Sequence, residues 1–185
     1  FLGAREYLNN RLRWCIWLHE VPPNKIKGLP DILDRIEKVR SFRANSVAKS
    51  TRDYQYHTLF RQVTQPKTDF ILVPRVSSER RKYIPIGFFS RNFIVGDSCQ
   101  AIPSGSLYHF GILSSKMHMA WVKYTCGRLK SDYRYSKDIV YNNYPWPLDL
   151  SEKNIKAVET KAQQVLDVRA EFKGSSLADL YDPIT

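Results

Sequence analysis

A stripe of apolar residues recurs at intervals of three and four positions in the second half of the chain. It comprises Phe110, Leu113, Met117, Ala120, Trp121 and Tyr124. Because this spacing places side chains on one face of an α-helix, we predict a single helix that ends near Gly127 and buries that face. We expect this long central helix to organise the rest of the fold.

A polar and aromatic segment follows this helix directly. Over residues 128 to 136, charged residues alternate with tyrosines in the period of two that is typical of a β-strand. In an extended ribbon, Lys130, Asp132 and Arg134 would share one face. The segment closes on Tyr144-Pro145-Trp146-Pro147, whose prolines stop a strand or a helix. We interpret residues 128 to 136 as a positioned surface ribbon.

Short apolar runs upstream of the central helix predict β-strands. They cover residues 69 to 74, 83 to 89 and 93 to 95, and turn-like polar residues separate them. This pattern indicates an antiparallel meander. Pro74 and Pro85 lie inside two of the runs, and they predict edge positions or bulges because proline lacks the backbone N–H that a central strand needs.

The N-terminal third of the chain mixes arginines with large apolar residues. We predict a short helix and then a buried strand over residues 13 to 18, where Trp14 and Trp17 join the core rather than a ligand-binding surface. A helix with one apolar face is expected from Pro30 onward. Residues 44 to 68 predict a polar, basic loop of the kind that often wraps a ligand.

The end of the chain predicts one amphipathic helix, capped by Ser151 and reaching to Phe172. Together these elements define an α+β fold with an antiparallel or mixed sheet, a long central helix and a C-terminal amphipathic helix. We expect residues 1 to 147 to form one domain and residues 148 to 185 to begin a separate helical segment.

The net charge of +11 is unevenly distributed along the chain. Residues 1 to 147 hold 24 Lys and Arg against 11 Asp and Glu, whereas residues 148 to 185 hold 5 against 7. A basic body of this kind points to a polyanion, and nucleic acid is the commonest such partner. A solvated basic surface without a partner has the same composition.

Cysteine usage and the start of the chain bear on its location. Cys15, Cys99 and Cys126 are odd in number and widely spaced, with no C-x-x-C pattern, which fits reduced thiols in a cytoplasm better than disulfides or a metal site. No apolar run has the length of a membrane span. The chain starts at Phe1 without a signal-peptide pattern, and we expect it to be a segment of a longer, cytoplasmic polypeptide.

The sequence lacks the motifs of catalysis and cofactor binding. There is no G-x-G-x-x-G, no Walker lysine loop, no G-x-S-x-G and no H-E-x-x-H. Gly105 stands alone and predicts a turn before the central helix. Asp69, Glu79 and Lys82 weakly match a nuclease set, but Glu79 and Lys82 are three positions apart and fall on opposite faces of a strand. We therefore expect no catalytic residue, no metal and no cofactor in this chain.

The ribbon instead carries groups that read base edges. Lysine suits O6 and N7 of guanine, aspartate accepts from N4 of cytosine, and arginine serves guanine or phosphate. Lys130 and Asp132 are therefore a matched set for the two halves of one G·C pair. A surface ion pair between residues two apart is the alternative explanation for them.

Several longer motifs occur in a fixed order. They are Pro74-Arg75-Val76-Ser77-Ser78-Glu79, Tyr83-Ile84-Pro85-Ile86-Gly87-Phe88, Met117-His118-Met119-Ala120-Trp121-Val122, Gly127-Arg128-Leu129, Tyr133-Arg134-Tyr135-Ser136 and Tyr144-Pro145-Trp146-Pro147. In this order they resemble the target-recognition domain of MmeI-like DNA methyltransferases and fused restriction-modification enzymes. Ser176-Leu177-Ala178-Asp179-Leu180-Tyr181-Asp182-Pro183 resembles the start of the helical C-terminal segment of the same family.

The resemblance implies a longer enzyme that methylates the exocyclic amine of adenine in duplex DNA with S-adenosylmethionine, and some members of the family also cut DNA through a nuclease domain. The family's catalytic N/D-P-P-Y/F motif and cofactor loop are absent here, since Asn143-Tyr144-Pro145-Trp146 differs in order and spacing. We expect no enzymatic activity from this chain itself. The expected partners are duplex DNA and the methyltransferase domain of the same polypeptide, and no membrane is expected.

The resemblance also implies that two variable positions before the Tyr133-Arg134-Tyr135-Ser136 motif read a base pair, and these are Lys130 and Asp132. We predict base reading in the major groove by Lys130, Asp132 and Arg134. Further contacts to phosphates or bases are expected from Arg128, Ser131, Tyr133, Ser136, Arg75, Ser77, Ser78, Arg80, Arg81, Lys49 and Arg52. The alternative is an RNA-binding or protein-docking module that uses exposed aromatic residues for stacking.

Overall fold

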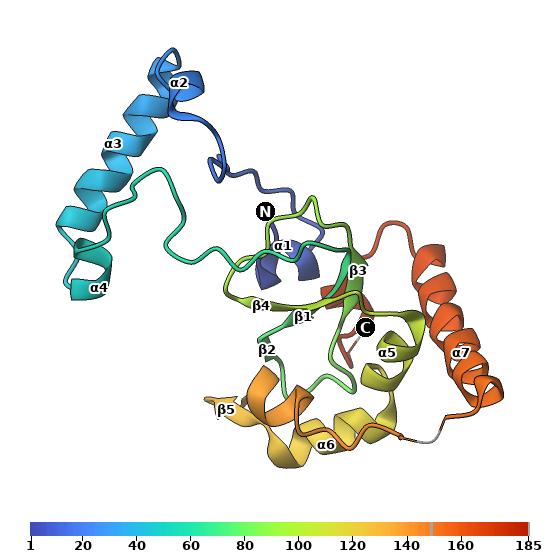
Figure 1. Cartoon of the computed structure of the whole chain (residues 1–185). Coiled ribbons are helices and arrows are strands. Elements are labelled where there is room, and N and C mark those ends of the chain that lie inside the picture. The colour runs from blue at the N-terminus through green and yellow to red at the C-terminus, as the bar shows by residue number, and fades with distance from the viewer. Residues whose placement is uncertain (149, 185) are drawn as a thin grey trace. The chain divides into compact units, whose positions relative to one another are not determined.

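The computed structural model describes residues 1–148 and 150–184, which form two compact units (Figure 1). Unit 1, here called the core unit, comprises Phe1–Arg13 and Gln65–Thr185. Unit 2, the helical unit, is Trp14–Thr64. Each unit has elements of its own.

A three-stranded antiparallel sheet lies at the centre of the core unit. β1 (Phe70–Pro74) is the middle strand, with β3 (Gly87–Phe89) on one side and β4 (Cys99–Pro103) on the other. All five residues of β1 are buried because both faces of the sheet are covered. Antiparallel strands together with helices confirm the predicted α+β class.

The strand order differs from the meander that the apolar runs predict. β1 takes the centre, and the next strand, β2 (Val76–Ser77), leaves this sheet for a second one. Residues 93 to 95 form no strand, and Val95 makes only an isolated parallel bridge with Leu2. The third strand is β4, which is only half-buried and therefore gave no continuous apolar run.

Two helices occupy the segment for which the sequence predicts one long helix. They are α5 (Leu107–Leu113) and α6 (Lys116–Thr125). The hydroxyl oxygen of Ser115 accepts a hydrogen bond from the backbone N–H of His118, at 3.1 Å, and so caps a new helix. The prediction of a single central helix is therefore wrong, because a serine cap satisfies the N–H groups at the break.

Successive residues of β1 enter two hydrophobic clusters. Ile71 and Val73 belong to the larger cluster, which also holds the buried side chains of α5 and α6. Phe70 and Leu72 belong to the smaller cluster, formed with the N-terminal helix α1 (Ala4–Leu8). Alternating side chains of one strand thus join the helices on one face of the sheet to the N-terminus on the other.

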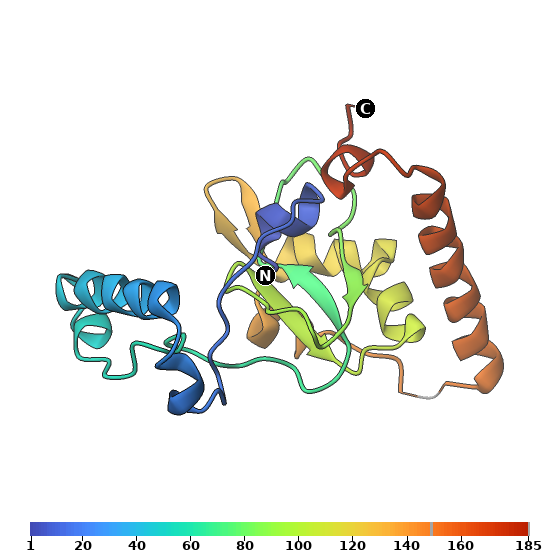
Figure 2. The same ribbon diagram turned by 90° about the horizontal axis from the view of Figure 1, so that it is seen from above.

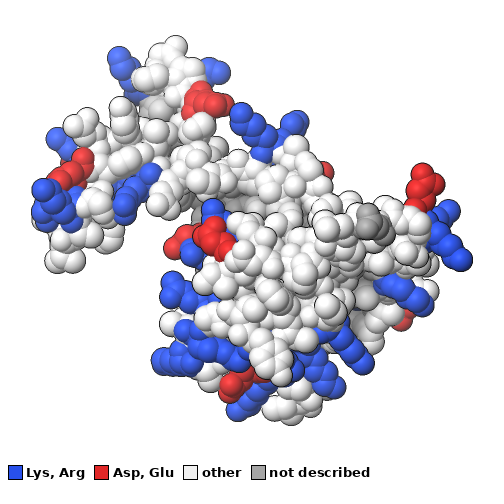
Figure 3. Space-filling view, turned by 60° about the horizontal axis from the view of Figure 1, so that its bottom comes forward, with Lys and Arg blue, Asp and Glu red and all other residues white. Residues whose placement is uncertain are grey.

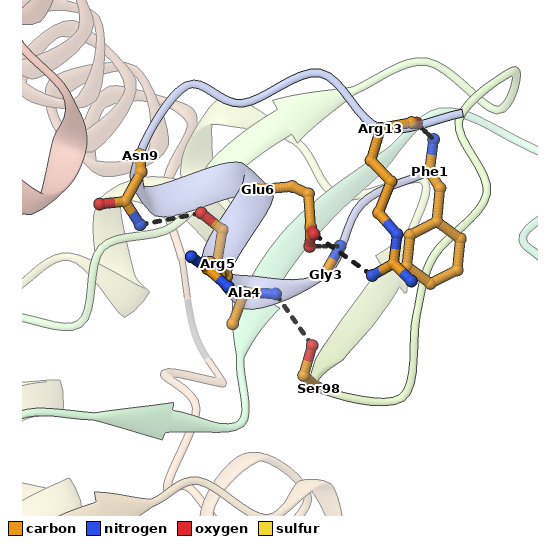
Figure 4. Close-up of polar contacts among 8 residues, drawn as sticks. All are labelled: Phe1, Gly3, Ala4, Arg5, Glu6, Asn9, Arg13 and Ser98. Carbon is orange, nitrogen blue, oxygen red and sulfur yellow. Dashed lines mark hydrogen bonds and ion pairs between the residues drawn. The ribbon is translucent and has the colours of Figure 1, made fainter. Parts of the chain in front are cut away.

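Hydrogen bonds hold the N-terminal residues in place, as Figure 4 shows. The amino group of Phe1 donates to the carbonyl of Arg13 at 2.7 Å, and the guanidinium of Arg13 lies 3.3 Å from the carboxylate of Glu6. The backbone N–H of Ala4 donates to the hydroxyl of Ser98 at 2.9 Å. Residues far apart in the sequence are thereby joined at the start of β4.

The helical unit contains α2 (Pro23–Ile26), α3 (Pro30–Ala44) and α4 (Lys49–Arg52). The predicted helix from Pro30 is confirmed, although none of its residues is buried. Residues 13 to 18 form no strand, and Trp14 is 87% exposed, so the predicted buried strand is wrong. The helical unit contains no other strand with which residues 13 to 18 could form hydrogen bonds.

The remaining elements follow β4 and the helix pair. A hairpin of β5 (Gly127–Leu129) and β6 (Asp132–Arg134) leads into the π-helix η1 (Lys137–Tyr141). The chain ends with α7 (Glu152–Glu171) and α8 (Leu177–Leu180). α7 confirms the predicted amphipathic helix.

Helix α7 packs along α5, as Figure 2 shows at the edge of the core unit. Gly111 permits this approach. A Cβ at Gly111 would lie 2.7 Å from Cγ1 of Val158 and 3.2 Å from the carbonyl oxygen of Val158. The two helices therefore touch through a position that tolerates no side chain.

We predict that Gly111→Ala destabilises the core unit by about 1–2 kcal/mol net. Alanine favours the helix by up to about 1 kcal/mol over glycine, but the added methyl group overpacks the helix contact. Val158 is β-branched on a helix and has little rotameric freedom with which to give way. Urea unfolding of the two proteins measures the difference.

Gly174→Ala is the matched control, because nothing lies within 4 Å of a Cβ there and the glycine does not have a positive φ. Its effect should stay within about 0.5 kcal/mol. Equal stability of the Gly111→Ala protein and this control would show that the α5–α7 contact is not tight.

Candidate nucleic-acid interface

The second sheet has the order β2-β6-β5 and carries most of the predicted site residues. β5 and β6 are antiparallel neighbours, and Leu129 pairs with Asp132. Lys130 and Ser131 therefore form the turn between the two strands. The segment that the sequence predicts as one extended ribbon is instead a tight hairpin.

One face of this sheet packs on the core. Tyr133 in the middle strand pairs with Ser77 on one side and with Arg128 on the other, so their side chains share a face. Tyr133 is 4% exposed and Ser77 is 2% exposed. Both were predicted as DNA contacts, but the structure covers their side chains.

The opposite face points away from the core. Asp132 and Arg134 flank Tyr133 in β6, so the alternation of a strand places them together on this outward face. Gly127 is paired with Arg134 and presents no side chain, and nothing lies within 4 Å of a Cβ there. On the Gly127 side of Arg134 the outward face is therefore open space, whereas Val76 pairs with Arg134 on the other side.

Lys130 lies at the tip of the hairpin rather than on a strand face. Its φ of 56° is in the left-handed region, which is unusual for a residue other than glycine. The expectation that Lys130, Asp132 and Arg134 share one strand face is therefore wrong for Lys130. Asp132 still lies two residues from it, across the turn.

Arg128 braces the hairpin from within. Its guanidinium lies 4.1 Å from the ring centroid of Tyr133, and its Nη1 donates to the carbonyl oxygen of Ser131 at 2.9 Å. These contacts hold the turn against β6. Arg128 was predicted as a DNA contact, but its guanidinium is used for these two contacts within the hairpin.

The loop after β2 folds back beside the hairpin. The backbone N–H of Glu79 donates to Oδ1 of Asp132 at 3.3 Å. The backbone N–H groups of Arg80 and Arg81 donate to Ser78, at 3.3 Å to the hydroxyl and 3.1 Å to the carbonyl oxygen. Residues 78 to 81, predicted separately from the ribbon, are therefore brought to its edge.

Arg75 links the two sheets. Its backbone carbonyl accepts from the N–H of Tyr135 at 2.8 Å, and its own N–H donates to the carbonyl of Ser98 at 2.9 Å. Its Nη1 donates to the carbonyl of Asp97 at 2.8 Å. Arg75 remains exposed beside the hairpin, and Ser136 begins η1 just beyond it.

Lys49 and Arg52 belong to α4 of the helical unit, whereas the other predicted contacts belong to the core unit. Both are exposed. Arg52 donates from Nη1 to the carbonyl of Ser46 at 3.0 Å. The structure therefore gathers the other predicted residues in the core unit and leaves these two in the helical unit.

Two contributors to the outward surface were not among the DNA contacts predicted from the sequence. Glu79 contributes a backbone N–H, for which no side-chain pattern exists. Leu129 is 51% exposed on the outward face opposite Asp132. The outward position of Leu129 follows only from the hairpin register. The sequence did not predict this register, because Lys-Ser is not one of the residue pairs typical of a two-residue turn.

Basic side chains gather on this part of the molecule. In Figure 3, where the side that lies lowest in Figure 1 is turned forward, Lys and Arg cluster over the lower part of the core unit with few acidic residues among them. The exposed basic residues of α6, the hairpin and η1 are Lys116, Lys123, Arg128, Lys130, Arg134 and Lys137. Such a surface attracts a polyanion.

A buried aromatic cluster supports the hairpin from behind. Nε2 of His118, in α6, lies 3.0 Å from the hydroxyl of Tyr135, which directly follows β6. The ring of His118 also packs edge-on against Tyr144, at 4.9 Å between centroids. Burial lowers the pKa of His118 to about 4, so the imidazole is neutral at pH 7.

The described residues hold no group of three or more His, Cys, Asp or Glu side chains arranged to bind a metal ion. Cys15, Cys99 and Cys126 are all free thiols. None of the helices within residues 1–148 and 150–184 has the length and hydrophobicity that crossing a membrane requires.

Residues 1–148 match the family described as MmeI, target recognition domain, and residues 150–185 match the family described as MmeI, C-terminal domain. The chain therefore belongs to the MmeI family. The resemblance read from the ordered motifs is therefore confirmed.

Two longer proteins are similar to this chain. "DNA methyltransferase A" of Bacillus subtilis (strain 168) is 40% identical over 186 residues, which cover 100% of this chain and 21% of that protein. The type IIL restriction-modification enzyme MmeI, solved in complex with DNA, superposes with a TM-score of 0.95 at 44% identity, over 100% of this chain and 25% of that one. The chain thus spans a quarter or less of these relatives.

We predict that His118 makes the protein less stable in mild acid. The unfolded chain takes up a proton at His118 below a pKa of 6.5, whereas the folded chain takes it up only near 4. Stability is therefore unaffected by His118 above pH 6.5 and falls as the pH drops from 6.5 toward 4. At pH 5 this loss is on the order of 2 kcal/mol.

The measurement is urea unfolding at pH 7.5 and pH 5.0 for the original protein and for His118→Gln, which cannot titrate. Carboxylates contribute equally to both proteins and cancel in the comparison. The original protein should lose more stability between the two pH values than the variant. Parallel losses would mean that the imidazole is charged in the folded state.

Proposed function

We propose that this chain is the DNA-recognition part of a longer DNA methyltransferase and that the β5–β6 hairpin reads base edges in the major groove. The observation that carries the proposal is the two-sided hairpin. Its inner face is anchored by Tyr133, and its outer face presents Asp132 and Arg134 with Lys130 at the tip.

The dimensions of a hairpin suit this role. The major groove of B-DNA admits a two-stranded β-ribbon, and each base pair presents a distinct pattern of donors and acceptors there. Because the hairpin backbone is anchored on the core, its outward side chains start from fixed positions. A flexible loop would present the same side chains in many positions. The DNA complex of the similar enzyme MmeI supports duplex DNA as the partner of this chain.

Asp132 is prepared to accept a hydrogen bond from a base. Its Oδ1 is held by the N–H of Glu79, and among the described residues no hydrogen bond reaches its other oxygen. That oxygen is free to accept from N4 of cytosine, while Lys130 donates to the guanine of the same pair. Arg134, which is exposed beside Gly127, reads a neighbouring guanine or binds phosphate.

We propose phosphate contacts for residues around the hairpin. Arg75 and Arg80 are exposed there, and Ser78, Arg81 and Ser136 are half-buried beside them. Lys49 and Arg52 of the helical unit form a second group of phosphate contacts. Ser77, Tyr133, Arg128 and Ser131 act instead as supports of the hairpin, since their side chains or carbonyls are used inside it.

The longer protein is proposed to methylate the exocyclic amine of adenine with S-adenosylmethionine. The name of the Bacillus relative supports methyl transfer, and that of MmeI supports a restriction-modification enzyme that also cleaves DNA. We further propose that residues 1 to 147 recognise DNA, that residues 148 to 185 begin the C-terminal domain, and that a methyltransferase domain in the same polypeptide receives the DNA. We also propose a cytoplasmic location, which a DNA partner and free cysteine thiols support.

The proposed function predicts steeply salt-dependent binding to duplex DNA. Each phosphate that a cation neutralises releases bound counterions, so affinity falls as salt rises. If the chain contacts six phosphates, raising the salt concentration from 50 mM to 200 mM should weaken binding on the order of a thousandfold. Fluorescence anisotropy with labelled duplex measures this fall.

Single-stranded DNA and RNA of the same sequence are the controls and should bind more weakly at every salt concentration. An affinity that does not change with salt would favour the protein-docking alternative. Preference for a single strand would favour the RNA-binding alternative.

The hairpin also predicts a change of specificity in the full-length methyltransferase that carries this chain. Lys130→Glu together with Asp132→Arg exchanges donor for acceptor across the G·C pair. Each mismatched contact costs about 1–3 kcal/mol, so the preferred base at one position should change from G to C while the other positions remain. Sequencing of methylated sites identifies the recognised site.

Arg80→Gln is the control for a phosphate contact and should weaken methylation at all sites alike. An unchanged recognition site in the double variant, or uniform loss at every position, would remove Lys130 and Asp132 from base reading.

A further inference from the structure

Arg134 lies between two buried tyrosines. Tyr133 and Tyr135 flank it in the chain, and they are 4% and 3% exposed. Both rings belong to the larger hydrophobic cluster, which also contains side chains of the central strand. The backbone at Arg134 is therefore held on each side by a ring in the core, while the side chain of Arg134 itself is exposed.

Tyr135 is held at three points. Its backbone N–H donates to the carbonyl oxygen of Arg75 at 2.8 Å, and its own carbonyl oxygen accepts from Nε2 of Gln100 at 3.4 Å. Its hydroxyl group lies 3.0 Å from Nε2 of His118, and this hydrogen bond is buried. The first two contacts hold the backbone, and the third holds the far end of the ring in the interior.

His118 is a fixed partner for this hydroxyl group. It is 1% exposed, its backbone N–H donates to the capping hydroxyl of Ser115, and its ring packs edge-on against Tyr144. Its second ring nitrogen, Nδ1, is buried and has no hydrogen-bond partner among the described residues. The imidazole therefore depends on Tyr135 for its hydrogen bond, and loss of that bond would leave Nε2 buried and unpaired as well.

We propose that Tyr135 is a positioning residue for Arg134, and that its hydrogen bond to His118 sets the place at which Arg134 meets a guanine in the major groove. The inference rests on the DNA-recognition function proposed above and extends it, by assigning Arg134 to a base rather than to a phosphate. The paired contact of a guanidinium with O6 and N7 of guanine has a fixed geometry and tolerates little displacement. A neighbouring ring that is held at its far end limits that displacement.

The same contact acts on Arg134 separately from the tip of the hairpin. Asp132 is held by the backbone N–H of Glu79, and Lys130 lies in the turn, so neither depends on the hydroxyl of Tyr135. Loss of this hydroxyl should therefore affect the base that Arg134 reads. The G·C pair assigned to Lys130 and Asp132 should be recognised as before.

The test is made in the full-length methyltransferase that carries this chain. Arg134→Gln, followed by sequencing of the methylated sites, first identifies the position of the recognition site that Arg134 reads. Discrimination at that position is then measured as the ratio of kcat/KM for two duplexes, one with the preferred guanine and one with adenine in its place. Thermal unfolding confirms that each variant is folded.

We expect Tyr135→Phe to lower this ratio roughly fivefold, the effect of losing one ordinary hydrogen bond. His118→Leu removes the same bond from the other side and should have a similar effect. The double variant should lose little more than either single variant, because both remove one shared contact. His118→Gln keeps a polar group that can reach Tyr135 and should retain more discrimination than His118→Leu.

Gly111→Ala is the control matched for stability. It destabilises the same unit at a different place, since the atoms nearest to an added Cβ belong to Val158 and Ala162. Its ratio of kcat/KM values should equal that of the original protein. This comparison separates a positioning role from a general loss of stability.

An unchanged ratio in Tyr135→Phe, or a decrease that Gly111→Ala reproduces, would overturn the positioning role and leave Arg134 as a base reader. An Arg134→Gln protein that methylates every site more slowly, with no position relaxed, would instead overturn base reading by Arg134 and the role of Tyr135 with it. The two failures are therefore distinguishable.

Discussion

The burial of one face of β6 against the core is the constraint on which the rest of the surface depends. Tyr133 belongs to the same hydrophobic cluster as Ile71 and Val73 of the central strand. With that ring fixed, strand alternation determines which side chains point outward, and Arg128 and the turn follow from the pairing. The position of the outward side chains is thereby set by ordinary hydrophobic packing rather than by polar contacts among themselves.

The sequence predicted those parts of the fold in which a local pattern suffices. The amphipathic periodicity of α7, the cap at Ser151 and the alternation around Tyr133 are local, and all three appear in the structure. The motifs also identified the family, because several of them in one order are far more specific than any single motif. Neither inference required knowledge of distant contacts.

The failures lie where hydrophobic periodicity alone does not decide the structure. The break at Ser115 depends on a side chain competing for backbone N–H groups, and the turn at Lys130 depends on a positive φ that lysine rarely adopts. Trp14 is exposed because the helical unit has no sheet that could cover it. The periodicity of apolar residues therefore missed a local cap and an unusual turn, and it could not foresee the contact that brings the loop of Glu79 to Asp132.

The contact between α5 and α7 has a consequence for how recognition modules are exchanged between related enzymes. The two family regions meet near residue 149, yet Gly111 of the first region lies against Val158 of the second. Arg169 in α7 further donates to the carbonyl of Ile86 at 2.7 Å and lies over the ring of Phe110. A chimaera joined at the family boundary would cut through a shared hydrophobic core, whereas one joined beyond α8 would keep these contacts within one transferred segment.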